Sequence, residues 1–172
     1  MGSGTAVYPR QSRPENERTM SAVPSQAFSF RPMSKDDVEA VMAIEHVLYA
    51  FPWTPGNFRD SLAAGYSCWV YEFGSHLVGY AVLMLAVDEA HVLNIAIGAE
   101  WQRQGLGRRF MQYLIKVARE YRAEMMFLEV RPSNLAAQRL YEDIGFNEIA
   151  TRKNYYPSHG GRENAILMGM AL

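Results

Sequence analysis

The chain has 172 residues, and its 17 lysine and arginine side chains nearly balance 18 aspartate and glutamate side chains, for a formal net charge of −1. This balance excludes a generally basic nucleic-acid-binding protein. Hydrophobic residues make up 49% of the chain and aromatic residues 12%, which suits one folded domain and excludes disorder of the whole chain.

The cysteine count and the apolar segments indicate where the protein works. Cys68 is the only cysteine and no Cys/His cluster has zinc-site spacing, so we expect a reducing compartment and no metal. The longest apolar stretch, residues 78–87, is far shorter than the roughly 20 residues that a membrane helix needs. Residues 1–19 lack the apolar segment of a signal peptide. We therefore expect a cytoplasmic protein without membrane contact, and favour a monomer.

Residues 1–24 are expected to lie outside the folded domain. Residues 1–19 are rich in Gly, Ser, Pro, Arg and Glu, and Met20 resembles an alternative start, so this stretch is interpreted as a disordered or added leader. Residues 25–172 show no internal repeat and no sign of a second domain, so we expect one domain there.

The predicted elements are, in chain order, a strand, two helices, three strands, a helix, a strand, a helix and two strands. Their expected ranges are residues 27–31, 35–49, 54–64, 66–73, 77–87, 91–97, 106–121, 125–130, 135–144, 146–152 and 164–170. This mixture predicts an α/β domain with a central mixed sheet flanked by helices.

Capping and turn residues mark several of these ends. Ser34 and Asp37 have the spacing of a capping box, and Thr54 followed by Pro55 is typical of a helix start. Gly145 stands where a helix commonly ends. A polar loop is expected between the last two strands, and it contains Pro157, Gly160 and Gly161.

The most informative segment is the Gln-Arg-Gln-Gly-Leu-Gly-Arg run at residues 102–108, between a strand and a strongly periodic helix. Gly105 and Gly107 let the backbone turn tightly and approach a ligand, while the following helix N-terminus offers unpaired N–H donors. Arg103 and Arg108 add charge suited to phosphate. The segment is thus typical of an anion site, with a plain glycine-rich turn as the alternative.

Two nucleotide-binding motifs are excluded for this loop. A Walker A loop requires Gly-Lys-Ser/Thr, which is absent from the sequence. A dinucleotide-binding fingerprint requires a third glycine at position 110, where Phe110 stands.

The loop resembles the Q/R-x-x-G-x-G/A signature of the GNAT (Gcn5-related) N-acetyltransferases, and the similarity extends over about residues 27–170. Further segments, in the same order, resemble the ribosomal-protein-alanine N-acetyltransferase (RimI) branch of that family. They include Ala50-Phe51-Pro52-Trp53, Asn94-Ile95-Ala96-Ile97, Leu128-Glu129-Val130-Arg131, Leu140-Tyr141-Glu142, Gly145-Phe146-Asn147-Glu148 and Arg152-Lys153-Asn154-Tyr155-Tyr156-Pro157.

The resemblance implies a single-domain GNAT fold with a mostly antiparallel sheet, acetyl-CoA as cosubstrate and no metal. It places the pantetheine arm along the strand of Ile95, Ala96 and Ile97. It places the coenzyme phosphates on Arg103, Gln104, Gly105, Leu106, Gly107 and Arg108. It also gives Asn134 a hydrogen bond to the coenzyme, for which a helix cap is the alternative.

Two residues have implied roles in proton transfer. Glu129 ends an apolar strand, so alternation alone allows either a solvent-facing carboxylate or one at a ligand site. An α-amine with a pKa of about 8 must lose a proton before it attacks, and the resemblance makes Glu129 the proton acceptor. Tyr141 is either a packing residue or, by resemblance, the proton donor to the departing thiolate.

The acceptor implied by the resemblance is the N-terminal alanine of a small-subunit ribosomal protein. Other protein N-termini, lysines or small amines are alternatives, and so is a coenzyme-binding module without turnover. The buried-strand setting of Cys68 favours a packed side chain over a nucleophile, and therefore direct transfer over an acyl-cysteine intermediate.

Overall fold

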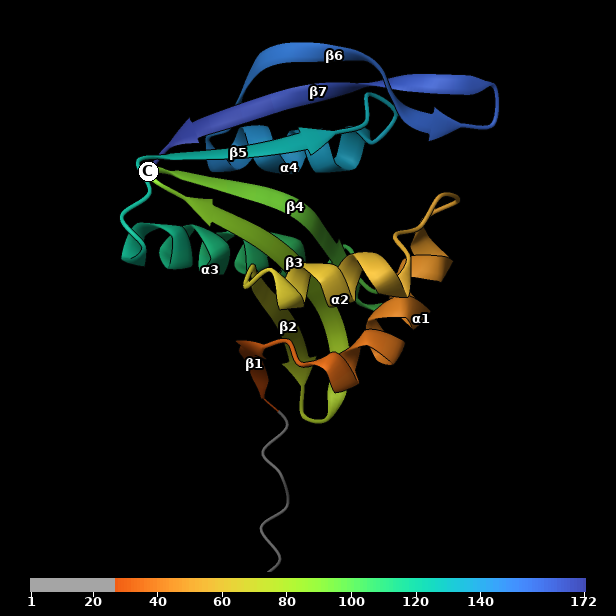
Figure 1. Cartoon of the computed structure of the whole chain (residues 1–172), viewed down its shortest axis with the longest axis vertical. Helices are drawn as coiled ribbons and strands as arrows, with labels where there is room; N and C mark the ends of the chain where they lie inside the picture. Colours follow the sequence, from red (N-terminus) through yellow and green to blue (C-terminus); the bar gives the residue numbers. More distant parts are fainter. Residues whose placement is uncertain (1–26) are drawn as a thin grey trace, which may run out of the picture.

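A seven-stranded sheet forms the centre of the computed structural model, which describes residues 27–172, and its strand order is β1-β2-β3-β4-β5-β7-β6. The strands are β1 (Phe28–Pro32), β2 (Ser67–Phe73), β3 (His76–Ala86), β4 (Glu89–Ile97), β5 (Met125–Val130), β6 (Asn147–Ser158) and β7 (Gly161–Ala171). The helices are α1 (Val38–Leu48), α2 (Pro55–Ala63), α3 (Leu106–Glu120) and α4 (Leu135–Ile144), with 3₁₀ turns at Lys35–Asp37 and Ala99–Trp101. The predicted α/β fold and the element order are confirmed (Figure 1).

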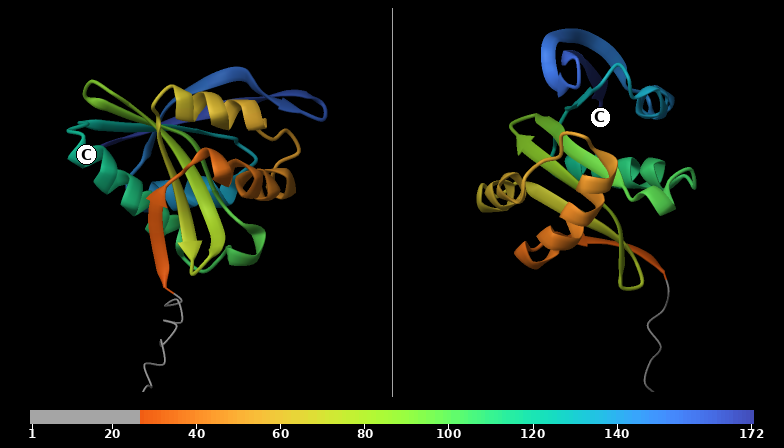
Figure 2. Two further views of the ribbon diagram at one scale, coloured as in Figure 1. Left: turned by 60° about the horizontal axis from the view of Figure 1, so that its bottom comes forward. Right: turned by 90° about the vertical axis from the view of Figure 1, so that its right-hand side faces the viewer.

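The helices cover the two faces of the sheet in pairs (Figure 2). Helices α1 and α2 pack on one face through a core that includes Val41, Phe58 and Tyr80. Helices α3 and α4 contribute to the core of the other face, which includes Phe110 and Leu128. None of the helices in residues 27–172 is long and apolar enough to cross a bilayer. The expected leader at residues 1–24 lies outside the described residues.

The sheet opens at its centre, where the site described below lies. Strands β4 and β5 form its one parallel pair within the described chain, and their pairing ends at Val92 and Leu128. In the β3–β4 ladder, Val82 pairs with Asn94 and Leu83 with Val92, so Leu93 is a bulged residue. A bulge bends its strand, so β4 turns away from β5 and leaves a V-shaped opening between them.

The prediction of a polar loop before the last strand is wrong. Strands β6 and β7 continue through this region, with Tyr156 opposite Glu163 and Pro157 opposite Arg162, after a register shift between Arg152 and Tyr156. Because β6 is the edge strand, Pro157 is tolerated without an N–H to donate. The alternating apolar pattern that marks a strand is missing from this exposed part of the hairpin, so the sequence did not predict that the two strands extend here.

The predicted helix starts are held by side chains. Thr54 Oγ1 accepts a hydrogen bond from the Asn57 N–H at 3.2 Å. Asp37 Oδ2 accepts from the Ser34 N–H at 2.7 Å, and the Asp37 carboxylate also pairs with Arg31 at 2.8 Å. The Arg31 hydrogen bond is the largest of the effects that lower the pKa of Asp37 from 3.8 to about 2.

Asp37→Asn is expected to lower the free energy of unfolding at pH 7 by about 1 kcal/mol, because the ion pair to Arg31 is partly exposed and screened. A lowered carboxyl pKa stabilises the folded state above pH 3.8, and this contribution disappears as pH falls towards 2. Thermal unfolding at pH 7 and pH 2 measures both effects, with the exposed Asp36→Asn as control. An equal loss at both pH values would contradict the assignment.

Candidate active site

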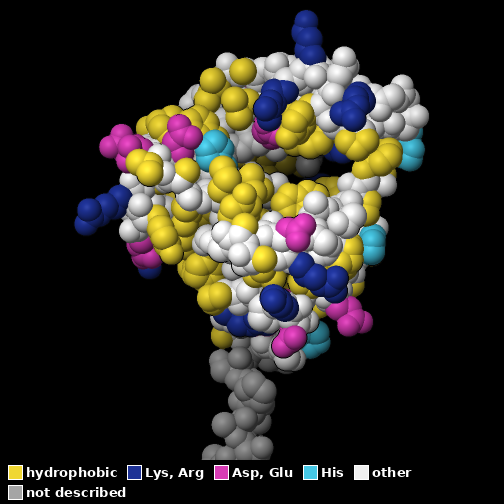
Figure 3. Space-filling view, in the orientation of Figure 1, with side chains coloured by type: hydrophobic (Ala, Val, Ile, Leu, Met, Phe, Trp, Pro, Cys, Tyr) yellow, Lys and Arg dark blue, Asp and Glu magenta, His cyan; other side chains and the backbone are white. Residues whose placement is uncertain are grey.

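A cleft of about 1020 Å³ lies where β4 and β5 separate. Its walls are β4, the loop before α3, the end of β5, α4, the end of α1 with Glu45 and Leu48, the segment between α1 and α2, and β6. The hollow is visible between the upper part of the molecule, which carries β6 and β7, and the body below it (Figure 3). All the site residues expected from the sequence except Gln104 line this cleft.

The glycine loop forms one end of the cleft and begins α3. Gly105 is the N-cap residue of α3 and has a φ of +78°, a left-handed conformation that favours glycine. The Arg109 N–H bonds the Gly105 carbonyl at 3.1 Å, so the N–H groups of Leu106, Gly107 and Arg108 precede the first helical bond. An added Cβ at Gly107 would lie 3.4 Å from Leu140 Cδ2 on α4, an ordinary contact distance, so packing against α4 does not by itself require glycine here.

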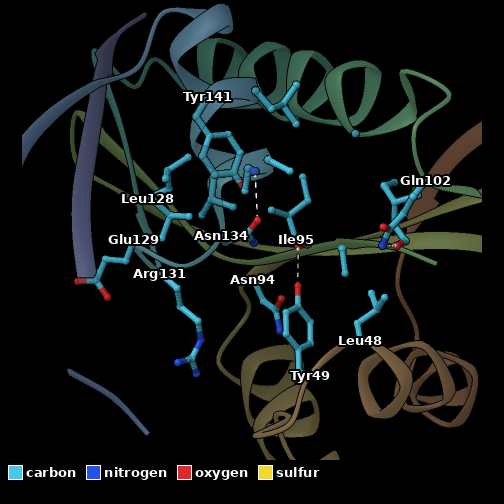
Figure 4. Close-up of a pocket in the computed structure, with 18 of the residues that line it drawn as sticks. Leu48, Tyr49, Asn94, Ile95, Gln102, Leu128, Glu129, Arg131, Asn134 and Tyr141 are labelled. Atoms are coloured by element: carbon cyan, nitrogen blue, oxygen red, sulfur yellow. Dashed lines mark hydrogen bonds between the residues drawn. The ribbon is translucent and has the colours of Figure 1, made fainter. Parts of the chain in front are cut away.

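A side chain outside the predicted set ties the loop to β4. Gln102 Nε2 donates to the Ile97 carbonyl at 2.9 Å (Figure 4). Gln104 turns back to the Glu100 carbonyl at 3.2 Å and does not line the cleft.

The arginines of the loop differ in their surroundings. Arg103 lines the cleft in a left-handed conformation, with a φ of 61°. Arg108 also lines the cleft, but its guanidinium pairs with Asp143 on α4 at 3.0 Å. Arg139, on the same helix as Asp143, adds another cation to the wall. Sequence reasoning missed Arg139, although its place one turn before Asp143 was a usable signal.

The β4 wall presents Ile95, Ala96 and Ile97 to the cleft. These residues lie beyond Val92, where pairing with β5 ends, so this strand edge is not covered by β5. An uncovered strand edge offers N–H and C=O groups to an extended ligand. The strand edge expected for the pantetheine arm is thus open on this side, and its contact with the coenzyme stays a prediction.

Glu129 on β5 and Tyr141 on α4 both line the cleft, and their side chains extend in different directions, with the Glu129 carboxylate pointing away from Tyr141 (Figure 4). By strand alternation, Glu129 points away from the core that contains Leu128 and Tyr141. Its side chain is 22% exposed and accepts a hydrogen bond from Arg152 on β6. The carboxylate is thus partly exposed and also lines the cleft, and its role in proton transfer stays a prediction.

Tyr141 is buried and keeps its proton. Its side chain belongs to the core beside α3 and lies near Phe146, with ring centroids 5.9 Å apart. Burial raises the pKa of the Tyr141 phenol, with smaller contributions from Tyr49 and Tyr156. The packing alternative is therefore met, and the phenol stays in the neutral form that a proton donor requires, while its role as donor stays a prediction.

Asn134 caps α4. Its Oδ1 accepts the Ala137 N–H at 3.1 Å (Figure 4), which is the capping alternative of the sequence analysis. This hydrogen bond uses the side-chain oxygen of Asn134, and Asn134 also lines the cleft.

Two further residues shape the side of the cleft nearest α1 and β6. Tyr49 follows α1, and its hydroxyl lies 3.5 Å from the Ile95 carbonyl, while burial raises the pKa of its phenol to about 12. Arg131 stacks over the Tyr156 ring at 4.3 Å and donates to the Pro157 carbonyl at 3.0 Å. Neither followed from a sequence motif, because both depend on contacts between segments far apart in the chain.

Known proteins share this fold and much of this sequence. The family model for the acetyltransferase (GNAT) family matches residues 38–146. A [ribosomal protein bS18]-alanine N-acetyltransferase of Escherichia coli K12 is 38% identical over 136 residues, which cover 79% of this chain and 92% of that protein.

Solved structures agree with these sequence matches. The crystal structure of the Escherichia coli ribosomal-protein-S18-alanine N-acetyltransferase superposes with a TM-score of 0.79 at 36% identity, over 84% of this chain and 94% of that chain. Ard1 from Thermoplasma volcanium gives a TM-score of 0.78 at 29% identity, over 85% and 98% of the two chains. The chain belongs to the GNAT acetyltransferase family.

Proposed function

We propose that this protein transfers the acetyl group of acetyl-CoA to the N-terminal α-amine of ribosomal protein bS18, on its first residue, alanine. The observation that carries this proposal is the joint match of sequence and fold to relatives that bear this activity in their names, over more than nine-tenths of those proteins. The family uses acetyl-CoA, which supplies an acetyl thioester when bound.

The cleft suits such a coenzyme. Backbone N–H groups before the first bond of α3, with Arg103 and Arg139 nearby, favour phosphate at the glycine loop. The uncovered β4 edge at residues 95–97 offers hydrogen bonds to the amide groups of a pantetheine arm. Asn134 stands at the start of α4, on the opposite wall.

The proposed reaction is a direct transfer within a ternary complex. Glu129, directly or through one water, accepts a proton from the α-ammonium, and the free amine attacks the thioester carbonyl carbon. Backbone N–H donors near Ile97 stabilise the negative oxygen that forms. As the C–S bond breaks, Tyr141 donates its phenolic proton to the sulfur, and the nitrogen of the new amide gives its second proton to the resulting phenolate.

Cys68 supports direct transfer over an acyl-cysteine intermediate. Its thiol is buried in the core on the α1 and α2 face and does not line the cleft. Burial raises the pKa of this thiol to about 11, so the nucleophilic thiolate is scarce at neutral pH.

Peptides that differ in their first residue test the proposed acceptor. Initial rates of thiol release should be fastest for a bS18 N-terminal peptide that begins with alanine and at least ten-fold lower for the same peptide beginning with leucine. Equal rates for the two peptides, or release only with lysine-bearing blocked peptides, would refute bS18 alanine as the acceptor and favour another GNAT acceptor.

The glycine loop gives a separate prediction about coenzyme affinity. Gly105→Ala is expected to weaken acetyl-CoA binding about 5-fold to 30-fold, because the left-handed conformation costs alanine about 1–2 kcal/mol and the free loop would leave the geometry that presents its N–H groups. Calorimetric titration measures the Kd. Gly160→Ala is the control, since its added Cβ meets open space without positive φ. An unchanged Kd for Gly105→Ala would contradict the phosphate-loop assignment.

A further inference from the structure

Glu45 is a buried carboxylate that the proposed reaction does not use. It lies near the end of α1, and only 2% of its surface is exposed. Burial raises the pKa of the Glu45 carboxyl and is the largest of the effects on it. A carboxylate this deep is costly unless several donors meet it, so its retention calls for a role that a hydrophobic side chain would not supply.

The donors to Glu45 come from three separate parts of the chain. The Trp53 backbone N–H donates to Oε1 at 2.7 Å. The Tyr80 hydroxyl on β3 donates to Oε2, and Asn94 Nδ2 on β4 lies 3.5 Å from the same oxygen. One carboxylate thus joins α1, the segment between α1 and α2, and two neighbouring strands.

Two of these donors belong to walls of the cleft. Trp53 is in the segment between α1 and α2, and Asn94 immediately precedes Ile95 on the open edge of β4 (Figure 4). The Trp53 ring is further fixed against Phe58, at 5.2 Å between centroids. Glu45 therefore connects residues 49–54 to the open edge of β4 through hydrogen bonds. Both substrates would meet beside this edge.

We propose that Glu45 is a positioning residue that holds residues 49–54 at a fixed distance from β4 and so shapes the entrance for the acceptor peptide. The inference rests on the proposed function. With the coenzyme phosphates at the glycine loop, the thioester lies at the other end of the β4 edge, beside residues 49–54, and the acceptor amine must reach it there. Within residues 27–172, none of the hydrogen bonds to the Glu45 side chain comes from the glycine loop, so the role concerns the acceptor end of the cleft and not the phosphate end.

Kinetics of Glu45→Ala test this proposal. The variant is expected to raise the KM for the acceptor peptide about 10-fold, the effect of losing about one buried hydrogen bond, with the KM for acetyl-CoA within two-fold of wild type. Glu45→Gln keeps an acceptor oxygen for the Trp53 N–H, and Tyr80 can accept from the new amide, so it should stay within about three-fold. Val41→Ala is the matched control. It leaves a cavity beside the same helix, so it should lower Tm without changing either KM.

Amide hydrogen exchange provides a readout that does not depend on turnover. Residues 50–54 should lose protection in Glu45→Ala and keep it in Glu45→Gln and Val41→Ala. Asn94→Ala, which leaves the carboxylate in place, should give an intermediate loss.

The outcomes separate this inference from the proposed function. If Glu45→Ala only lowers Tm, as Val41→Ala does, with exchange and acceptor KM unchanged, the positioning role is refuted. If the wild type acetylates no α-amine, the proposed function fails, and exchange at residues 50–54 still decides whether Glu45 holds the segment.

Discussion

Glu129→Gln is expected to lower kcat about 100-fold at pH 7 while the KM for acetyl-CoA stays unchanged, because the amide cannot accept the proton of the acceptor ammonium. The deficit should shrink above pH 8, where the α-amine, with a pKa of about 8, loses its proton without help. A pH profile of kcat from pH 6 to 9.5 measures both features.

A carboxylate elsewhere in the sheet is the control for this variant. Glu148 lies on β6, which β7 separates from β5, and it is exposed and does not line the cleft, so Glu148→Gln should match wild type at every pH. A Glu129→Gln enzyme with the kcat and pH profile of wild type would remove Glu129 from the role of base. A uniform loss at all pH values would indicate a positioning role instead.

Tyr141→Phe is expected to lower kcat by about 100-fold with both KM values within two-fold of wild type, because it removes the phenolic proton and keeps the ring. The buried ring continues to pack beside Phe146, so Tm should change by only about 2 °C. Steady-state kinetics together with thermal unfolding separate the chemical effect from a structural one.

Tyr113→Phe on α3 serves as the comparison for Tyr141. It removes a hydroxyl from a stacked ring that does not line the cleft, so its kcat should equal that of wild type. If Tyr141→Phe also keeps its kcat, or if it raises both KM values instead, the proton-donor role is wrong.

Much of the fold could be predicted from local pattern. The periodic helix at α3, the cap at Thr54 and the terminal Gly145 depend on residues close in sequence, and all three were confirmed. The last two strands were predicted, but the extension of their hairpin past Arg152 and before Asn164 was not, because its register shift and the tolerated Pro157 follow from its place at the edge of the sheet.

The site divides in the same way. The glycine loop and the β4 edge carry local signals, and the structure brings them together in one cleft. The pairings of Arg108 with Asp143 and of Glu129 with Arg152 join residues more than 20 positions apart, so no spacing rule predicted them. In the sequence alone, Glu45 occupies a polar position of an ordinary amphipathic helix. Its contacts with Trp53 and Asn94 are visible only in the structure.

The position of the transferred acetyl group tests the central claim most directly. The protein is incubated with acetyl-CoA and a peptide that carries a free N-terminal alanine and an internal lysine, beside the same peptide with a blocked N-terminus, and the products are mapped by mass spectrometry. We predict one acetyl group, on the α-amine of the free peptide, and none on the blocked peptide. Acetylation of lysine in both peptides, with the α-amine unmodified, would contradict α-amine acetylation.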